Sequence, residues 1–498
     1  MKILVAASEV VPFAKTGGLA DVAGSLPLAL RERGHDVRVI MPGYRGIHDA
    51  GIDIRDTGEK IHVRLGDHII TAGLFEGLLA DRVPVYFVRY DPFFDREFLY
   101  GTPEGDYPDN ASRFIFFSRA ILDAMKSLDF WPQVLHLNDW QTALAALYLR
   151  TYQGVDQYSR VSSLFTIHNL GYQGLYWQYD FPLTGLGWEY FTPEGIEFYG
   201  KMNLLKGGLV FADRLNTVSR KYAQEIRTAE FGFGLEGVLE SRSRHLSGIL
   251  NGMDDEAWNP ATDPLIPARY SAQSLAGKII CKKALCKSFG LNFSEKKPVI
   301  GCVSRLTSQK GFDLITEIAD DLGAIDLSLV VLGDGDAAYR TALRRFADRY
   351  PGRFGLKIGY DNRLAHLIEA GSDFFLMPSR YEPCGLNQMY SLRYGTVPIV
   401  RDTGGLSDTV TRFNRSTGRG TGFKFTEYSG AALLKCVRQA LRTYQDRAAM
   451  KRLMANGMAC DHSWSRSAEA YEALYAALDR DNRGTASILE RKPGNDGS

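Results

Sequence analysis

Short apolar runs rich in β-branched residues alternate with helix-like segments along this chain, and they do so in two successive series. The first series comprises residues 2–7, 37–41, 85–88, 134–137 and 164–167, and the second comprises 299–304, 329–332, 356–359, 374–377 and 397–400. Near-continuous apolar strands separated by helices are typical of parallel sheets that are buried on both faces. The pattern therefore predicts an α/β fold with two doubly wound, Rossmann-like domains.

The length of 498 residues also exceeds what one hydrophobic core usually supports. We expect the domains to join near residues 251–267, where an Asn-Pro pair and two further prolines interrupt regular structure. The expected N-terminal domain is therefore 1–250, and the expected C-terminal domain is 251–462. The polar residues 481–498 are expected to be a disordered tail. Ligands of open parallel sheets bind beyond the carboxyl ends of the strands, so we expect the active site in a cleft between facing domains.

Composition argues against several classes of partner. The 59 Lys and Arg residues balance 58 Asp and Glu residues to a net charge of +1, which gives no support for binding of nucleic acid or an anionic membrane. No stretch is long and apolar enough to span a bilayer, and Glu9 interrupts the first apolar run too early for a signal peptide. The six cysteines show no spacing typical of a zinc site. These features favour a reduced, cytoplasmic compartment.

A first basic loop lies between the first predicted strand and the first predicted helix. It contains Lys15 followed by Gly17 and Gly18. Glycines let the backbone approach a ligand closely, and the following helix offers unpaired N–H groups with the positive end of its dipole. A lysine beside such a turn suits a phosphate, although a plain strand-to-helix turn with a solvated lysine is the more common meaning of so short a motif.

A second basic loop occupies the same place in the second series, where Arg305 and Lys310 flank a turn that leads into a helix. Two such loops at equivalent positions predict that the chain grips a diphosphate. The segment Gly333-Asp-Gly-Asp-Ala-Ala resembles a dinucleotide-binding fingerprint. Asp334 and Asp336 would place two negative charges beside a pyrophosphate, so we do not expect an NAD site there.

Polar residues follow several other predicted strands. Glu382 comes after the apolar run 374–377, where it suits a ligand of sugar hydroxyls or a catalytic carboxylate; a surface charge or a partner of a helix N-terminus is the alternative. Thr403-Gly-Gly after the next strand either adds backbone donors or makes a tight turn. His136, Asp139 and His168 lie at the ends of neighbouring strands and predict a sugar-binding wall, although a lone histidine there is more often a core or turn residue.

Taken in order, these segments closely resemble those of bacterial glycogen synthases and plant starch synthases that use ADP-glucose. The resemblance covers residue 1 to about residue 480. The segments are Lys15-Thr-Gly-Gly-Leu-Ala-Asp-Val, His136-Leu-Asn-Asp-Trp, Phe165-Thr-Ile-His-Asn-Leu, Asn251-Gly-Met-Asp, Trp258-Asn-Pro, Ser304-Arg-Leu-Thr, Gln309-Lys-Gly, Ser379-Arg-Tyr-Glu-Pro-Cys-Gly-Leu and Thr403-Gly-Gly-Leu. The resemblance implies a GT-B-type fold, in which two Rossmann-like domains face a central cleft. It also implies no metal or other cofactor, and a C-terminal helix over 463–480 that joins the first domain.

The implied reaction transfers glucose from ADP-glucose to the non-reducing end of glycogen or another α-1,4-glucan primer, with retention of configuration. The implied catalytic residues are Asp139, His168, Arg305, Lys310 and Glu382, with the two cations on the diphosphate and Glu382 on glucose hydroxyls. The implied substrate-binding residues are Lys15, Gly17, Gly18, Asp21, Tyr100, Asn251, Tyr360, Cys384, Gly385, Leu386, Thr403, Gly404 and Gly405. Tyr360 would stack on adenine, and Tyr100 would shape the acceptor side.

Some positions depart from related patterns, and two other functions stay open. Met253, Tyr381 and Ser407 are departures that look like packing variants. Tyr390 stands where transferases of the Glu-x7-Glu type carry a second glutamate, which argues against relatives resembling sucrose synthase. The open alternatives are a transferase that uses UDP-glucose or another acceptor, and a catalytically silent glucan-binding scaffold. The leaving-group cations argue against the scaffold, and the sequence gives no oligomeric state.

Overall fold

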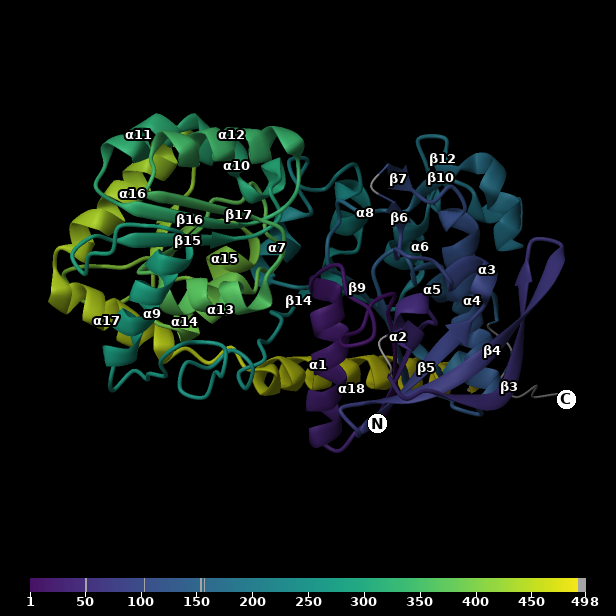
Figure 1. Ribbon diagram of the computed structural model, residues 1–498. Helices are drawn as coiled ribbons and strands as arrows, with labels where there is room; N and C mark the ends of the chain where they lie inside the picture. The colour runs from purple at the N-terminus through teal and green to yellow at the C-terminus, as the bar shows by residue number, and fades with distance from the viewer. Residues whose placement is uncertain (50–51, 103, 153–154, 156, 491–498) are drawn as a thin grey trace, which may run out of the picture. The chain divides into compact units, whose positions relative to one another are not determined.

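The computed structural model describes residues 1–49, 52–102, 104–152, 155 and 157–490 (Figure 1). The chain divides into two compact units. Unit 1 contains Met1–Val218, Ala223–Gly252 and the C-terminal segment from Trp464 onward, and unit 2 contains Ser219–Tyr222 and Met253–Ser463. The expected N-terminal domain, 1–250, included the short segment Ser219–Tyr222, which belongs to unit 2 in the structure.

A nine-stranded sheet forms the centre of unit 1. Its strands, in spatial order, are β14 (Leu246–Gly248), β13 (Arg214–Thr217), β9 (Ser162–Ile167), β8 (Val134–Asn138), β1 (Lys2–Ala6), β2 (Asp36–Pro42), β5 (Val83–Arg89), β4 (His68–Leu79) and β3 (Arg55–Leu65). Strands β14 to β5 are parallel. All of β8 and β9 is buried, as expected of parallel strands covered on both faces.

The other edge of this sheet is antiparallel, and sequence analysis did not include its strands β3 and β4. In β3 the side chains of Ile61, Val63 and Leu65 are buried, whereas Lys60, His62 and Arg64 are exposed. A strand with one face in water alternates in this way and lacks the continuous apolar run that identifies a parallel strand. The search for continuous apolar runs therefore did not predict the strands at this edge of the sheet.

Helices and two small sheets complete unit 1. The helices are α1 (Gly18–Glu32), α2 (Arg45–Asp49), α3 (Asp91–Phe94), α4 (Asn110–Ser127), α5 (Leu144–Thr151), α6 (Leu204–Phe211), α8 (Glu236–Ser241) and α18 (Trp464–Glu490), and α7 (Arg220–Glu225) begins within Ser219–Tyr222. The small sheets are β6 (Gly101–Thr102) with β7 (Gly105–Asp106), and β10 (Leu175–Trp177), β12 (Lys201–Asn203) and β11 (Glu197–Phe198).

Helix α18 packs beside α1 and against strands β8 and β9. The Asn216 side-chain amide donates to the Tyr471 hydroxyl over 3.0 Å, and the Tyr475 hydroxyl lies 2.8 Å from Nδ1 of His136. The helix continues to Glu490, ten residues beyond the expected range 463–480, where a tail was expected. An established helix extends at low cost because each added residue gains one hydrogen bond. Residues 491–498 of the expected tail lie outside the described residues.

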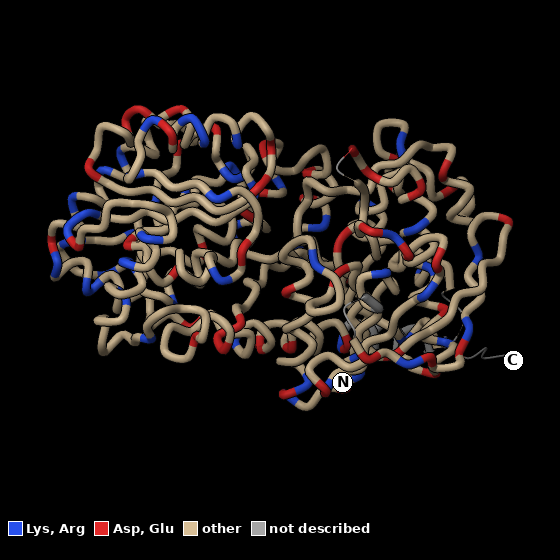
Figure 2. Tube along the Cα trace, viewed as in Figure 1, with Lys and Arg blue, Asp and Glu red and all other residues tan. Residues whose placement is uncertain are grey.

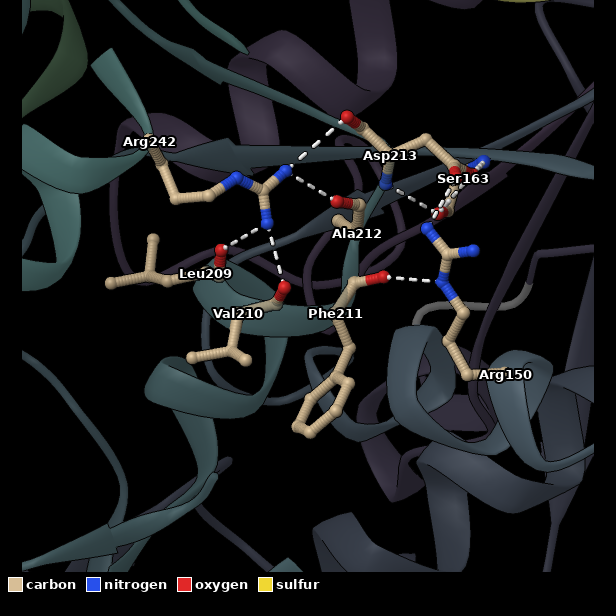
Figure 3. A network of polar contacts seen from close by, with 8 residues as sticks. All are labelled: Arg150, Ser163, Leu209, Val210, Phe211, Ala212, Asp213 and Arg242. Atoms are coloured by element: carbon tan, nitrogen blue, oxygen red, sulfur yellow. Dashed lines mark hydrogen bonds and ion pairs between the residues drawn. The ribbon is translucent and has the colours of Figure 1, made fainter. Parts of the chain in front are cut away.

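Two arginines hold the carbonyl end of α6 (Figure 3). Arg242 donates to the carbonyl oxygens of Leu209, Val210 and Ala212 over 2.6 to 3.0 Å. Arg150 donates to the carbonyl of Phe211 over 3.1 Å, and to the carboxylate of Asp213 over 2.6 Å. The last carbonyls of a helix have no partner within the helix, so these side chains satisfy them.

Unit 2 contains a second parallel sheet, with six strands. Its spatial order is β17 (Phe354–Ile358), β16 (Ser328–Gly333), β15 (Val299–Val303), β18 (Phe374–Met377), β19 (Val397–Arg401) and β20 (Phe423–Phe425). Its helices are α9 (Ala276–Ser288), α10 (Phe312–Glu317), α11 (Ala319–Ala324), α12 (Ala337–Arg349), α13 (Asn362–Gly371), α14 (Asn387–Arg393), α15 (Gly404–Thr409), α16 (Gly430–Tyr444) and α17 (Arg447–Met458). All strand pairs are parallel.

Successive residues of β16 enter different apolar clusters of unit 2. Leu329 and Val331 join the cluster that contains Val437 of α16, and Val330 and Leu332 join the cluster that contains Ile368 of α13. Side chains of a strand alternate between the faces of a sheet, so helices cover both faces of this one. The predicted α/β class with two doubly wound domains is confirmed.

Charge and hydropathy of the described residues add two observations. Basic and acidic residues are interspersed along the trace of each unit (Figure 2). Among the described helices, none is long and apolar enough to cross a membrane.

Candidate functional site

Strand β15 is the point in unit 2 where the order of the sheet reverses, because its neighbours are β16 on one side and β18 on the other. Ligands of doubly wound sheets bind outside the carboxyl ends of the strands at such a point. Lys310 follows β15 at the end of a short 3-10 helix, Ser308–Lys310, and Glu382 follows β18. The sheet therefore brings together the two segments that sequence analysis had singled out separately.

The Lys310 ammonium donates to both carboxylate oxygens of Glu382, over 2.8 Å to Oε1 and 2.7 Å to Oε2. The Ser379 hydroxyl also donates to Oε2, over 2.9 Å. Glu382 is 5% exposed, so the lysine offsets the cost of burying its charge. Sequence analysis had assigned one residue to the diphosphate and the other to the sugar. In the structure they form one charged pair.

Glycines allow the neighbouring loops to approach this pair. Gly311 has φ +78°, and a Cβ atom there would lie 2.2 Å from the carbonyl oxygen of Pro378. Gly404 has φ +44°, and its Cβ would lie 1.9 Å from the carbonyl oxygen of Glu382. The Gly405 N–H donates to that same carbonyl over 3.0 Å. Thr403-Gly-Gly therefore makes a close turn against the Glu382 segment, where larger residues do not fit.

The remaining predicted residues of unit 2 surround the carboxyl end of the sheet. Cys384 is buried, and Gly385 has φ +71°. The Gln388 amide donates to the carbonyls of both residues over 3.0 Å, which fixes the turn before Leu386. Arg305 is exposed in the loop after β15. Tyr360 follows β17, is 75% exposed and donates to Oδ1 of Asn362 over 3.0 Å.

In unit 1 the first basic loop is held by a residue to which sequence analysis gave no role in a site. Glu9 is 4% exposed, and one of its oxygens accepts the backbone N–H groups of Thr16 and Gly17. Its other oxygen accepts the Thr16 hydroxyl over 2.6 Å and the Tyr100 hydroxyl over 2.7 Å. Glu9 therefore already accepts the backbone N–H groups of Thr16 and Gly17, the two residues that precede the helix beginning at Gly18.

Lys15 projects from this loop and is half exposed. Its ammonium lies 2.7 Å from Oδ1 of Asp21, which is in the first turn of α1. Burial, and then the charge of Glu9, raise the pKa of Tyr100 well above its usual value, so this hydroxyl stays protonated. A cavity of about 580 Å³ lies beside the loop, lined among others by Lys15, Tyr44, Arg96 and Tyr100. This volume falls in the range of small-molecule sites.

Asp139 and His168 come together where β8 and β9 end. The backbone N–H of His168 donates to Oδ1 of Asp139 over 2.7 Å. Asp139 has φ +55°, an uncommon conformation that is typical of functional sites. Burial raises the pKa of Asp139 to about 7 and lowers that of His168 to about 3. The imidazole of His168 is therefore neutral near pH 7.

The tautomer of His168 follows from its neighbours. The Asn138 amide nitrogen donates to the carbonyl oxygen of Ala6 over 3.0 Å, so the amide oxygen faces Nε2 of His168 at 2.9 Å. Nε2 then carries the proton, and Nδ1 is left as the acceptor of the ring. Asn251 is 6% exposed, and its Oδ1 is buried without a hydrogen-bond partner. Both residues therefore have polar atoms that suit a ligand rich in hydroxyl groups.

His136 does not belong to this group. It is fully buried between Tyr475 of α18, 2.8 Å from its Nδ1, and the Thr166 hydroxyl, 2.7 Å from its Nε2. Burial lowers its pKa to about 3. The expectation that His136 lines a sugar-binding wall is therefore wrong, because both ring nitrogens are used within the core. Within the described residues, no group of three or more His, Cys, Asp or Glu side chains could hold a metal ion.

Two family models match the chain. The starch synthase catalytic domain matches residues 2–241, and the glycosyl transferases group 1 model matches residues 287–454. Among curated proteins, glycogen synthase of Koribacter versatilis (strain Ellin345) is 52% identical over 478 residues, which cover 95% of this chain and 98% of that protein. Glycogen synthase 2 of Geobacter sulfurreducens is 47% identical over 485 residues, 97% of this chain and 100% of the relative.

Two solved structures are similar to this chain over 96% of its length. The catalytic domain of starch synthase IV from Arabidopsis thaliana, bound to ADP and acarbose, superposes with a TM-score of 0.87 at 33% identity, covering 96% of this chain and 99% of that chain. Sucrose-phosphate synthase from Thermosynechococcus elongatus superposes with a TM-score of 0.60 at 16% identity, covering 96% and 98%. The second likeness concerns the fold alone.

Proposed function

Because the chain belongs to the family of bacterial glycogen synthases and starch synthases, we propose that it is a retaining glucosyltransferase that moves glucose from ADP-glucose to the non-reducing end of an α-1,4-glucan. Its two doubly wound units are those of the GT-B-type fold. The observation that carries the proposal is the Lys310–Glu382 pair, which joins a cation and a carboxylate at the switch point of the second sheet. The ADP and acarbose in the related starch synthase structure support the choice of donor and acceptor.

Unit 2 holds the donor. Departure of ADP builds negative charge on its diphosphate, and a preorganised cation stabilises that charge more than it stabilises the bound donor. Lys310 uses two of its three N–H groups on Glu382 and has a third for a phosphate oxygen. Arg305, exposed in the same loop, supplies the second cation. With two cations on the leaving group, the proposed reaction uses no metal ion and no other cofactor.

Glu382 holds the sugar. Its carboxylate accepts hydrogen bonds from glucose hydroxyls while its two hydrogen bonds from Lys310 hold it in place. The Gly404 turn lies against the Glu382 carbonyl, so the backbone of the sugar site is fixed before the donor arrives. Binding energy is then available for the transition state, because the site does not have to be ordered during the reaction.

Unit 1 supplies groups for the sugar and the acceptor. Nδ1 of neutral His168 accepts a sugar hydroxyl, and the unpartnered Oδ1 of Asn251 accepts another. We assign Asp139, whose pKa is raised to about 7, to the reacting centre, which keeps the role that the sequence-based prediction gave it. Tyr100 and the cavity beside Lys15 are assigned to the glucan acceptor. The roles of Lys15 on the donor and of Tyr360 on adenine stay predictions.

The direct test measures incorporation of labelled glucose into glycogen from ADP-glucose and from UDP-glucose. We expect efficient incorporation from ADP-glucose. A clear preference for UDP-glucose would overturn the donor assignment, and no incorporation from either would favour the scaffold. The anomeric product is read by digestion with an α-1,4-specific hydrolase. The six cysteines, all among the described residues, are thiols, which supports a reducing, cytoplasmic location for this reaction.

A further inference from the structure

Both kinds of charge occur along unit 2, but one stretch of it is far more basic than the rest of the chain. Residues 411–458 contain ten Lys and Arg against two Asp and Glu, a net charge of +8, whereas the other residues contain 49 against 56, a net charge of −7. Nine of the ten cations are exposed and are called the basic surface: Arg412, Arg415, Arg419, Lys435, Arg438, Arg442, Arg447, Lys451 and Arg452. We propose that the basic surface is a docking site for an acidic segment of another protein.

The basic surface is formed by three neighbouring elements, the loop 411–422, α16 and α17. The Asn456 side-chain amide of α17 donates to the carbonyl of Gly418 over 2.9 Å, which holds the loop against this helix. Arg415 of the loop lies 2.9 Å from the carboxylate of Asp446, the N-cap residue of α17. Helices α16 and α17 pack on each other. Lys and Arg accordingly gather at the left of Figure 2, where Figure 1 labels α16 and α17.

Each helix carries its cations at helical spacing. In α16 they are three and four residues apart, which places them on the face opposite to the core residues Leu433 and Val437: Lys435, Arg438 and Arg442. In α17 Arg447 and Lys451 are four residues apart. Like charges at this spacing destabilise a helix, so folding alone does not favour the arrangement. A local arrangement that opposes folding is typical of a functional surface.

Few carboxylates neutralise the basic surface. Arg415 pairs with Asp446, and Arg438 lies 3.4 Å from Asp321 of α11. The other seven cations form no ion pair within the described part of the chain. Seven of the nine cations are arginines, whose planar guanidinium groups bind a carboxylate through two parallel hydrogen bonds. The surface can therefore accept several carboxylates of a partner.

The distribution of charge favours a short acidic segment over nucleic acid or a membrane. A long polyanion or an anionic bilayer would also face the remainder of the chain, whose net charge of −7 repels it. Residues 411–458, all of which the structure describes, expose no large aromatic or aliphatic side chain that could stack on bases or enter a bilayer. An acidic polypeptide segment is short enough to contact the basic surface alone.

The loop of the basic surface is separate from the proposed donor site. Loop 411–422 leads into the first residue of β20, and the strands of this sheet are parallel, so the loop lies at their amino ends. Lys310 and Glu382 follow the carboxyl ends of β15 and β18. A partner docked at the loop therefore leaves the donor site open. Docking would bring the transferase to another protein without stopping transfer, and the inference goes beyond the proposed function without depending on it.

The test measures binding of a fluorescein-labelled oligoglutamate peptide by fluorescence anisotropy. The test variant, Arg442→Gln/Arg447→Gln/Lys451→Gln, removes three exposed cations that have no ion pair among the described residues. We expect it to bind the peptide at least about tenfold more weakly than wild type, because the removed charges attract the carboxylates. Binding to wild type should weaken as the salt concentration is raised, since salt screens exposed charges.

The control variant, Lys287→Gln/Arg344→Gln/Arg345→Gln, removes the same charge from exposed positions of α9 and α12 and should bind the peptide as wild type does. Both variants should keep the wild-type rate of glucose transfer. The test variant should unfold at the same temperature as wild type or a higher one, because the repulsion between Arg447 and Lys451 is removed.

Four results would overturn this assignment. The first is absence of peptide binding to wild type, or equal binding to the test variant. The second is an equal loss in the control variant, which would show a general effect of net charge. The third is tighter binding of a DNA oligonucleotide, or of vesicles that contain phosphatidylserine, than of the peptide. The fourth is self-association of wild type that the test variant loses, which would assign the basic surface to a second copy of this chain.

Discussion

Lys310 contacts both carboxylate oxygens of Glu382, at 2.8 and 2.7 Å, and the two residues follow neighbouring strands that are separated along the chain by two others. Removing either partner therefore does two things at once. It takes away a group that binds the donor, and it leaves the other partner as a largely buried charge without its counter-ion. Kinetic and stability measurements on the same variants separate these effects.

We expect Lys310→Ala to lower kcat/KM for ADP-glucose by about 100- to 1000-fold, the usual cost of removing one group that stabilises developing negative charge. Lys287→Ala, at an exposed lysine of α9, is the matched control and should retain wild-type rates. Wild-type kinetics in Lys310→Ala would show that the leaving group is stabilised elsewhere.

The pair also predicts non-additive stability. Lys310→Met and Glu382→Leu should each destabilise unit 2 by about 3 kcal/mol, because each leaves one buried charge uncompensated. The double variant should be less destabilised than the sum, with a coupling of about 1–3 kcal/mol. Calorimetry of all four proteins measures this coupling. Additive effects would mean that the two side chains do not interact in solution.

Glu9→Gln tests whether the buried carboxylate fixes the loop of Lys15. A glutamine keeps one acceptor but turns an amide donor toward N–H and O–H groups that need acceptors. We expect a stability loss of about 1–3 kcal/mol and a higher KM for glycogen. Tyr100→Phe removes only one of these hydrogen bonds and should cost about 1 kcal/mol. Equal effects of both changes would contradict the central position of Glu9.

Asp139 predicts a pH dependence of stability. Its pKa is raised to about 7 in the folded protein, against an ordinary value of 3.8, so the folded state binds this proton more tightly than the unfolded state. The free energy of unfolding therefore falls as the pH rises from about 4 to about 7 because of this group. Asp139→Asn keeps an oxygen for the N–H of His168 and removes the titration. Its stability relative to wild type should rise between pH 5 and pH 7, as measured by urea unfolding at each pH.

Arg242, which follows α8 and binds the last carbonyls of α6, is expected to have a purely structural effect. Arg242→Ala removes donors from the carbonyls of Leu209, Val210 and Ala212 and should lower the free energy of unfolding by about 2–3 kcal/mol. Arg244→Ala, two positions away and exposed, should change it by less than about 0.5 kcal/mol. Equal unfolding temperatures for the two variants would contradict the role of Arg242.

The sequence predicts the parallel strands well because burial on both faces leaves a continuous apolar run, as in β16. It does not predict β3 and β4, whose exposed faces break that run. Glu382 and Lys310 were recognised singly, but their pairing depends on β15 lying next to β18, which is a property of the folded sheet. Strand order is set by packing, which local patterns do not encode.

Long-range contacts explain the two remaining differences in the site. Glu9 binds Tyr100, which is 91 residues away, so its role is invisible in the local pattern. His136 is removed from the candidate site by Tyr475, 339 residues away in α18. His136 was visible as a polar group near a strand end, whereas Glu9 was noted only as a break in the first apolar run. Only the folded chain shows which of them has its partners inside the core.

Helix α18 has a consequence for how the protein is made. Tyr471 and Tyr475 complete the core over Asn216 and His136, yet they are translated later than every residue of unit 2. The whole of unit 2, which ends at Ser463, emerges before them. All residues of unit 2 are therefore synthesised before the part of α18 that packs against β8 and β9 of unit 1. Unit 1, which contains the first residues to be translated, is therefore completed only after unit 2.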